Sequence, residues 1–450
     1  MSGIALLVPD LLSEIMFALP SSISQKFAFA QVSRRWRDLA LDSHLFWSSF
    51  TGGDSKVDCY RVPLILERSG AMLHIHFRFT SGKLADWPAD ALKALVPHVA
   101  RIVSLNIEFT TPMNVDALLN SGLEFSTLQT LRLKSSIYRN VPGLLITAPE
   151  LRTLDIERIH LTHWDTLLSP SLESIRLCDS PVEMLLEILK RCPRARCIVL
   201  QTWYPWSGNS IENSFAAFPS RPIAPALREL ELRVRENDLV RILKAGFSDV
   251  VLHSLAGCIY NGHSEDDVEL LSGALLPGVG FLVIFRLVDM RELELHDGAG
   301  HIRRLRCWND DSYFEVMDAW KYLSVHYGLH KTVREIQIRP EYWDEYLEVF
   351  ESYAPQLEDG ITLTIETDWD TFSADNSKIM RLPGLAKVEF NDSRNADYLF
   401  RTVSDVLARI EPPKARKVQV CVGKKKYAKQ DALFDSLREN NWVICAHCES

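Results

Sequence analysis

The chain has 450 residues, of which 47% are hydrophobic and 24% are charged, and its formal net charge at pH 7 is −9. A chain of this length exceeds one compact domain of ordinary size, so at least two structural units are expected. The acidic balance speaks against a nucleic-acid-binding protein, because such a protein gains its affinity from an excess of Lys and Arg.

The apolar segments and the cysteines point to a protein that works inside the cell. The run from Ile4 to Val8 is too short for a secretory signal and has no basic residue before it. The most apolar stretch, residues 274–288, is shorter than the ~20 residues that span a bilayer, so it is expected to form a buried strand. Nine cysteines without framework spacing are typical of reduced thiols. We therefore expect a location in the cytoplasm, the nucleus or both, and no contact with a membrane.

The first predicted element is a short helix between Pro9 and Pro20. A proline suits the first helical turn, where its missing N–H needs no partner, and the second proline ends the helix. Leu12, Ile15 and Leu19 recur at three- and four-residue spacing and form one apolar stripe.

A second helix is expected from about residue 24 to 37, with Trp36 as its largest anchor, followed by Leu45, Phe46 and Trp47. A unit of roughly 45 residues buries too little surface to be robust by itself, because domains of ~40 residues usually need outside support. The pattern therefore predicts a partner that covers part of this unit.

Residues 7–50 resemble the F-box family. The resemblance is carried by three groups, Pro9-Asp10-Leu11-Leu12, Val32-Ser33-Arg34-Arg35-Trp36-Arg37 and Phe46-Trp47. It implies an F-box at residues 1–50 that docks on a Skp-type adaptor, which joins it to a cullin-RING complex for ubiquitination of a bound protein. Carried over position by position, the adaptor-binding or motif-core residues would be Pro9, Leu12, Ile15, Leu19, Val32, Trp36 and Trp47.

Beyond a polar linker at residues 51–56, an aliphatic-x-x-aliphatic-x-aliphatic pattern recurs along the chain. Four successive copies end at residues 107, 133, 156 and 177, at intervals of 26, 23 and 21 residues. This period resembles that of leucine-rich repeats, in which a strand and a helix stack on the next copy. Other copies are Leu227-Leu230-Leu232, Phe247-Val250-Leu252, Met290-Leu293-Leu295 and Val333-Ile336-Ile338, with Ile198-Leu200 as a weaker one.

The repeats favour an α/β leucine-rich-repeat-like solenoid over residues 57–300, continued in an irregular form with a C-terminal cap over 301–450. The alternatives are an ordinary layered α/β domain and a separate C-terminal α/β domain. Arg132, Lys134 and Arg176 alternate with the aliphatic residues, so they are expected to face outward on the side of the arc that binds ligands.

An aromatic loop, Trp203, Tyr204 and Trp206, either contacts a target protein or folds back onto the core. Residues that suggest a metal or an enzyme are few. Cys445, His447 and Cys448, with Cys421, are a weak zinc candidate, and His74 and His76 share one face of a predicted strand. No phosphate loop, nucleophile elbow or paired metal-binding histidine motif occurs in the sequence.

The sequence thus predicts a non-catalytic substrate receptor of a cullin-RING ubiquitin ligase, without cofactor or metal. It would bind a Skp-type adaptor and an unidentified target protein. A scaffold with a vestigial F-box is one alternative, and an enzyme or metal protein built on the C-terminal region is another.

Overall fold

The computed structural model describes residues 9–202 with short gaps and, after residue 225, mainly the strands and the residues beside them up to 444. The longer ranges outside the described residues are 203–225, 260–281, 308–322, 339–359, 367–378, 392–402, 422–434 and 445–450. The chain forms two compact units. The first comprises Met1–Asn209 and Pro219–Arg228, and the second comprises Ser210–Phe218 and Glu229–Ser450.

The first unit begins with four short helices, α1 Pro9–Ala18, α2 Ile23–Gln31, α3 Arg34–Asp42 and α4 His44–Ser48. The single helix predicted over residues 24–37 is therefore wrong. It is divided because Ser33 has an extended backbone and its side chain accepts a hydrogen bond from Trp36 N, which caps a new helix.

A run of parallel strands follows the helices in the first unit, and each strand pairs with the next one in the sequence. The first of them, β1, includes Thr51 and Gly52, so the predicted linker at 51–56 is wrong at its start. The strands are β1 Ser49–Gly52, β2 Leu73–Phe79, β3 Ile102–Phe109, β4 Thr130–Val141, β5 Thr153–Leu161, β6 Ser174–Cys178 and β7 Cys197–Gln201.

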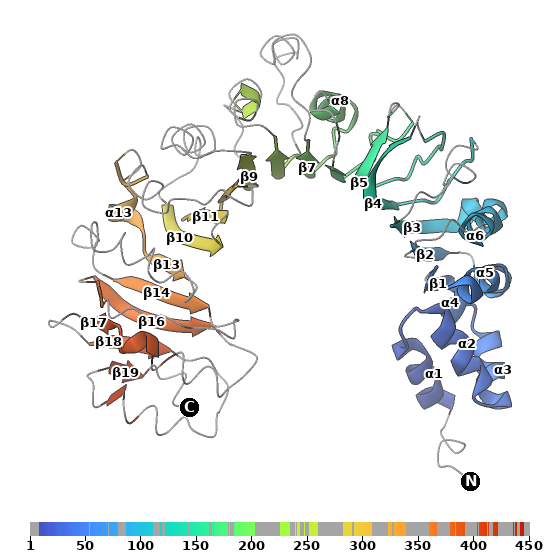
Figure 1. Ribbon diagram of the computed structural model, residues 1–450, viewed down its shortest axis with the longest axis horizontal. Coiled ribbons are helices and arrows are strands. Elements are labelled where there is room, and N and C mark those ends of the chain that lie inside the picture. The colour runs from blue at the N-terminus through green and yellow to red at the C-terminus, as the bar shows by residue number, and fades with distance from the viewer. Residues whose placement is uncertain are drawn as a thin grey trace. The chain divides into compact units, whose positions relative to one another are not determined.

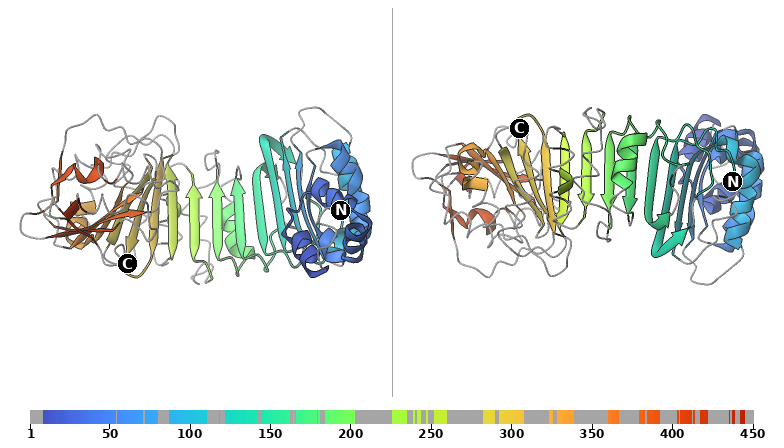
Figure 2. Two further views of the ribbon diagram at one scale, coloured as in Figure 1. Left: turned by 90° about the horizontal axis from the view of Figure 1, so that it is seen from below. Right: turned by 90° about the horizontal axis from the view of Figure 1, so that it is seen from above.

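The register of these strands aligns the repeating aliphatic positions. Figure 2 shows the strands of this sheet side by side. The second and third positions of the predicted pattern fall into two rows of buried side chains that cross these strands. One row contains Ile75, Leu105, Leu131, Leu154, Ile175 and Ile198, and the other contains Phe77, Ile107, Leu133, Ile156, Leu177 and Leu200.

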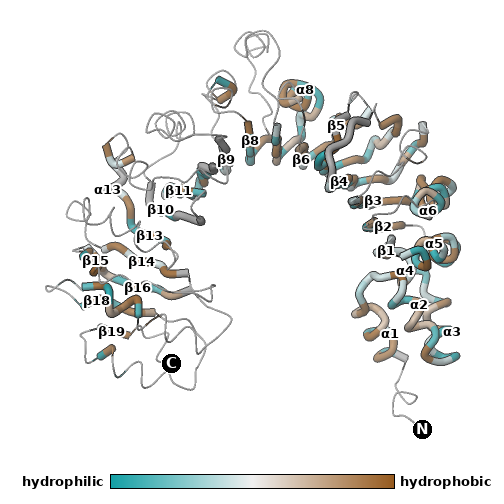
Figure 3. Tube along the Cα trace, in the orientation of Figure 1, coloured by the Kyte–Doolittle hydropathy of each residue, from teal (hydrophilic) through white to brown (hydrophobic). Residues whose placement is uncertain are grey.

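The helices that connect the strands lie on one side of this sheet (Figure 1). They are α5 Lys56–Arg68, α6 Trp87–Leu95 with the 3-10 turn Val96–Arg101, and α8 Met184–Arg191. Hydrophobic and hydrophilic residues both occur along α8 in Figure 3, and its described hydrophobic residues are buried. The buried rows thus pack beneath the helices, and the other face of the sheet carries the polar residues.

The second unit contains a mostly parallel sheet. Its strands pair in the order β8, β9, β12, β11, β10, β13, β14, β16, β18, β19. They are β8 Glu229–Arg233, β9 Ser254–Ile259, β10 Leu282–Asp289, β11 Glu292–Asp297, β12 Ile302–Cys307, β13 Glu335–Ile338, β14 Ile361–Glu366, β16 Leu385–Asn391, β18 Val418–Cys421 and β19 Trp442–Ile444.

Two short strands, β15 Met380–Arg381 and β17 Ile410–Glu411, form a separate pair, and α13 Leu329–Thr332 precedes β13. The expected strands at 361–366, 386–390 and 417–422 correspond to β14, β16 and β18. Of the helices expected at 311–327, 341–353 and 395–410, most residues lie outside the described part of the chain.

Two predicted repeat copies in the second unit are wrong. Leu293 and Leu295 lie on β11, which runs antiparallel to both of its neighbours and is not a parallel repeat strand. The copy that ends at Leu252 precedes β9, in which Leu255 and Gly257 pair with the aliphatic positions of β8. The sheet continues across residue 300, because β10 pairs with β13. The domain boundaries predicted at residues 50 and 300 fall inside the two units and stay predictions.

Candidate protein-binding site

The four N-terminal helices pack around an aromatic core. Trp47 is fully buried, its Nε1 donates a hydrogen bond to the Ala40 carbonyl at 2.6 Å, and its ring lies 5.5 Å from the ring of Phe27. Phe46 contacts both Trp47 and Phe29, with ring centroids 5.0 and 5.5 Å apart. The Phe-Trp pair of the sequence therefore holds the helices together.

The four N-terminal helices are joined to the sheet of the first unit. Thr51 N donates a backbone hydrogen bond to the Ser21 carbonyl at 2.7 Å, and Ser24 Oγ donates to Asp58 Oδ1 at 2.7 Å. Arg68 of α5 lies over the ring of Trp47 at 5.1 Å. Strand β1 and helix α5 thus fix the orientation of the N-terminal helices within this unit.

The structure separates the predicted adaptor-binding residues into buried and accessible ones. Leu12 and Trp47 are buried in the core of the four N-terminal helices. Ile15 and Val32 are exposed, at 37% and 53%, whereas Leu19 and Trp36 are partly exposed. Pro9 begins α1, but its side chain lies outside the description.

Other apolar residues of these helices, which the sequence analysis did not select, are also exposed. Leu11 and Phe17 of α1 reach 44% and 56% exposure, and Leu45 of α4 reaches 75%. Met16, which follows Ile15 and is not part of the predicted stripe, is buried. The face of α1 is therefore rotated from the predicted one, so that Leu12 and Met16 face inward while Leu11 and Ile15 face water. Leu11 and Ile15 are four residues apart, and so are Leu12 and Met16, so the sequence allows either pair to face inward. Only the packing of α1 against its neighbours decides which pair is buried.

The polar face of the sheet in the first unit is the second accessible surface. Arg132, Lys134 and Arg176 are exposed, as the alternation along the strands predicted. Of the two strand histidines, His74 is exposed and His76 is half-buried, with its Nε2 3.4 Å from Glu108 Oε1. Glu108 also accepts a hydrogen bond from Arg78 Nε at 3.0 Å. On this face, ion pairs therefore link neighbouring strands.

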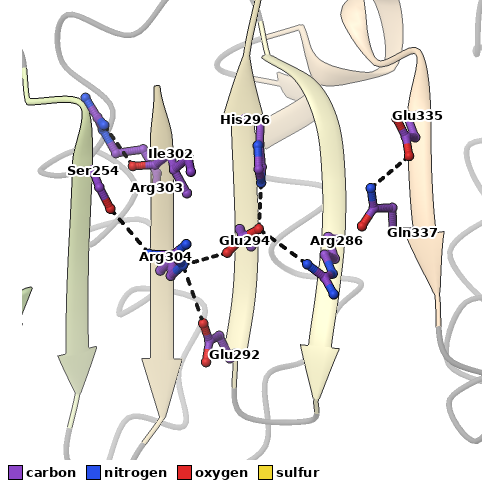
Figure 4. A network of polar contacts seen from close by, with 10 residues as sticks. All are labelled: Ser254, Arg286, Glu292, Glu294, His296, Ile302, Arg303, Arg304, Glu335 and Gln337. Carbon is purple, nitrogen blue, oxygen red and sulfur yellow. Dashed lines mark hydrogen bonds and ion pairs between the residues drawn. The ribbon is translucent and has the colours of Figure 1, made fainter. Parts of the chain in front are cut away.

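In the second unit a polar network is centred on Glu294 of β11 (Figure 4). Its carboxylate accepts hydrogen bonds from Arg304 Nε at 2.5 Å and from His296 Nε2 at 2.6 Å, and Arg286 Nη1 lies 3.7 Å away. The pKa of Glu294 is lowered to about 2, chiefly by the hydrogen bond from His296 and then by Arg304, whereas burial acts in the opposite direction. The ion pairs of this network link β12, β11 and β10, and we interpret their role as structural.

Other candidate sites lie largely outside the described residues. This holds for Trp203, Tyr204 and Trp206 and for the cluster that ends at Cys448. In the part of the chain that the structure describes, no group of three His, Cys, Asp or Glu residues is arranged to hold a metal ion. Within the same part, no helix is long and apolar enough to cross a bilayer.

A scan against models of protein families finds no match for this sequence, and no curated protein sequence matches it. The function is therefore inferred from the two accessible surfaces of the first unit, the exposed apolar residues of the N-terminal helices and the charged face of the sheet.

Proposed function

We propose that this chain is the substrate receptor of a cullin-RING ubiquitin ligase of the SCF type, acting in the cytoplasm or nucleus. Its N-terminal helices dock on a Skp-type adaptor, and its sheet binds a target protein. The observation that carries the proposal is the combination of the F-box residue groups with apolar side chains that stay uncovered on α1 and at the end of α2. Leu11 and Ile15 lie one helical turn apart, and Val32 follows α2 directly.

The proposal includes a leucine-rich-repeat-like solenoid as the architecture of the target-binding part. A hydrogen bond that recurs between successive strands supports it. The amides of Gln129, Arg152, Glu173 and Arg196 donate to the carbonyls of Val103, Gln129, Arg152 and Glu173, at distances of 2.8 to 2.9 Å. Such repetition is typical of a stack in which each unit contacts its neighbour.

A second recurring contact supports the same architecture. Thr127 Oγ1 donates to the carbonyls of Ala100 and Ile102, and Ser171 Oγ donates to those of Pro149 and Leu151. Both side chains stand four residues before the central aliphatic residue of their strand, Leu131 or Ile175. The same position of two repeats thus satisfies carbonyl groups of the repeat before it.

In this proposal the chain contributes proximity and no chemical step. Holding a target beside the ubiquitin-loaded enzyme replaces a bimolecular encounter with a local one. The effective concentration depends on how rigidly the chain positions its cargo.

Co-purification with a Skp-type adaptor tests the proposal. Ile15→Asp and Val32→Asp place a charge on exposed positions, so the helices should keep their fold while adaptor affinity falls by about tenfold or more. Leu145→Asp is the matched control, because Leu145 is an apolar residue exposed to 55% between β4 and β5. It should bind the adaptor as the unchanged chain does.

Two outcomes would count against the proposal. If the unchanged chain fails to bind any Skp-type adaptor, the ligase function is lost and a scaffold with a vestigial F-box takes its place. If all three variants bind alike, the adaptor contacts some other surface.

A further inference from the structure

Four exposed basic residues of the charged face lie on β2, β4 and β6, and a fifth, Arg158 of β5, donates a hydrogen bond to the Ser136 carbonyl at 2.9 Å. Arg78 stands on β2, Arg132 and Lys134 on β4, and Arg176 on β6. We call these four residues the cation ladder. All of them are exposed.

Acidic residues occupy the strands between the bases. Glu108 of β3 pairs with Arg78 at 3.0 Å, and Glu157 of β5 pairs with Lys134 at 2.7 Å. Asp155 of β5 lies 3.9 Å from Arg132 and stands opposite Arg176 in the register. The charges therefore alternate along two rows that cross the strands. These rows are Arg78–Glu108–Lys134–Glu157 and Arg132–Asp155–Arg176.

The bases and the acids differ in their access to solvent. The side chains of Arg78, Arg132 and Lys134 are 53 to 55% exposed, whereas those of their acidic partners are 28 to 29% exposed. The carboxylates thus lie low between the strands, while the longer basic side chains reach further into solvent. A ligand that approaches this face meets cations first, although the whole chain carries a net charge of −9.

The spacing of the ladder selects among anionic ligands. Two strand intervals correspond to about 9.4–9.8 Å, because neighbouring strands lie about 4.7–4.9 Å apart. In a polyproline II helix every third side chain points the same way, at a distance of about 9.3 Å. In the register Arg78 shares a row with Lys134, and Arg132 shares the neighbouring row with Arg176. An extended peptide that crosses the strands in this conformation can thus place two carboxylates, three residues apart, on the two bases of either row.

We propose that the cation ladder binds a polyproline II segment with Asp or Glu at every third residue. This deepens the proposed function, because it names the chemistry of a target segment, and it rests on that function only for its cellular role.

A peptide fits the ladder better than a single-stranded nucleic acid does. Phosphates follow one another more closely than the bases of the ladder, so some of them would lie over Glu108, Asp155 and Glu157 and be repelled. Single-strand binding also uses aromatic side chains on which bases stack. On the described part of this face, the outward positions of β2 to β6 carry no aromatic side chain except the imidazoles of His74 and His76.

Peptide binding to the full chain tests the proposal by fluorescence anisotropy. One labelled peptide has the sequence Glu-Pro-Pro repeated three times, and the matched peptide has three Glu and six Pro residues with the Glu residues at every second position at its start. Equal charge and composition leave only the spacing different. We expect the first peptide to bind about fivefold more tightly at low salt and to lose affinity as salt rises.

Substitutions on the ladder sharpen the test. The double variant Arg132→Gln and Lys134→Gln should weaken binding of the first peptide by about fivefold or more. Lys93→Gln is the control, since Lys93 is an exposed, ion-paired lysine on α6, which lies on the helical side of the sheet. Its binding should not change, and thermal melting should show that each variant is folded.

A third variant checks the register. Arg78→Gln leaves the row of Arg132 and Arg176 intact, so it should lower the affinity by no more than about twofold. Combining Arg78→Gln with Arg176→Gln breaks both rows and should weaken binding by about fivefold or more. Equal affinity for both spacings, no effect of either double variant, or tighter binding of a single-stranded oligonucleotide of equal charge would overturn the proposal. No adaptor takes part in these measurements, so their failure is distinct from a failure of adaptor docking.

Discussion

Lys26 is a lysine buried in the core of the N-terminal helices. It is only 5% exposed, its Nζ donates a hydrogen bond to the Phe46 carbonyl, and the same atom lies 4.1 Å from the centre of the Phe46 ring. Burial lowers its pKa from 10.5 to about 8. The folded chain therefore carries an ammonium group at neutral pH in a place that disfavours charge.

This pKa predicts that the first unit becomes more stable in mild alkali. Between about pH 8 and 10.5 the unfolded state binds the Lys26 proton more readily than the folded state, so the free energy of unfolding rises with pH. The gain should be about 2 kcal/mol between pH 7 and pH 9.5. Urea unfolding at both values measures it. In Lys26→Met this gain should disappear, while the exposed Lys93→Met should keep it; a gain that persists in Lys26→Met contradicts the prediction.

Glu294 gives the opposite dependence in the second unit. The hydrogen bonds from His296 and Arg304 lower its pKa from 4.5 to about 2, so its contribution is fully present above about pH 4.5 and is lost as the pH falls towards 2. The contribution is about 3 kcal/mol. Glu294→Gln should lower the free energy of unfolding of this unit by about that amount at pH 7 and flatten its acid dependence. Urea unfolding from pH 6 to pH 3 checks this, and an unchanged acid slope in Glu294→Gln would refute it.

At the scale of elements, the turn between β1 and α5 depends on a close approach of backbones. Gly53 has φ +102°, and a Cβ placed there would lie 2.8 Å from the Arg78 carbonyl oxygen and 3.0 Å from the Phe79 ring. The Gly52 Cβ position is also blocked, by Ile23 of α2. The passage from the helices to the sheet is therefore tightly packed.

Gly53→Ala should cost about 2 kcal/mol or more in the free energy of unfolding, because left-handed backbone strain adds to the contact with β2. Gly122→Ala is the control, since Gly122 has φ +67° but nothing within 4 Å of its Cβ position. It should cost about 1 kcal/mol from strain alone. Denaturant unfolding compares the two, and equal losses would show that the contact of Gly53 with β2 has no energetic weight.

The sequence predicted most strands of the first unit, because a strand buried on one face repeats its aliphatic residues at every second position. This pattern does not give the direction of a strand. Only residues 290–291 separate β10 from β11, and so short a connection permits only antiparallel pairing. The sequence has no Asn-Gly or Asp-Gly pair there that would indicate a hairpin. Strand β9 was misplaced because Gly257 stands where the pattern requires an aliphatic residue.

The candidate site was predicted less completely than the strands. The residue groups located the N-terminal helices, but the phase of α1 and the burial of Lys26 depend on contacts between helices. A lysine is normally assigned to the surface, and only the reach of its side chain from α2 to the Phe46 carbonyl explains its position. The charged face was predicted at Arg132, Lys134 and Arg176, but the acids that lie between them emerge only from the parallel register.

At the scale of the whole molecule, each of the two units has a buried core of its own, with Leu131 and Ile156 in the first and Leu363 and Val388 in the second. We therefore expect two transitions in differential scanning calorimetry. For a unit of about 200 residues, 1 kcal/mol shifts the Tm by roughly 2–4 °C. Gly53→Ala should then lower one transition by about 4–8 °C, and Glu294→Gln should lower the other by about 6–12 °C. If both substitutions shift one common transition, the two units unfold together and the independence of their cores is wrong.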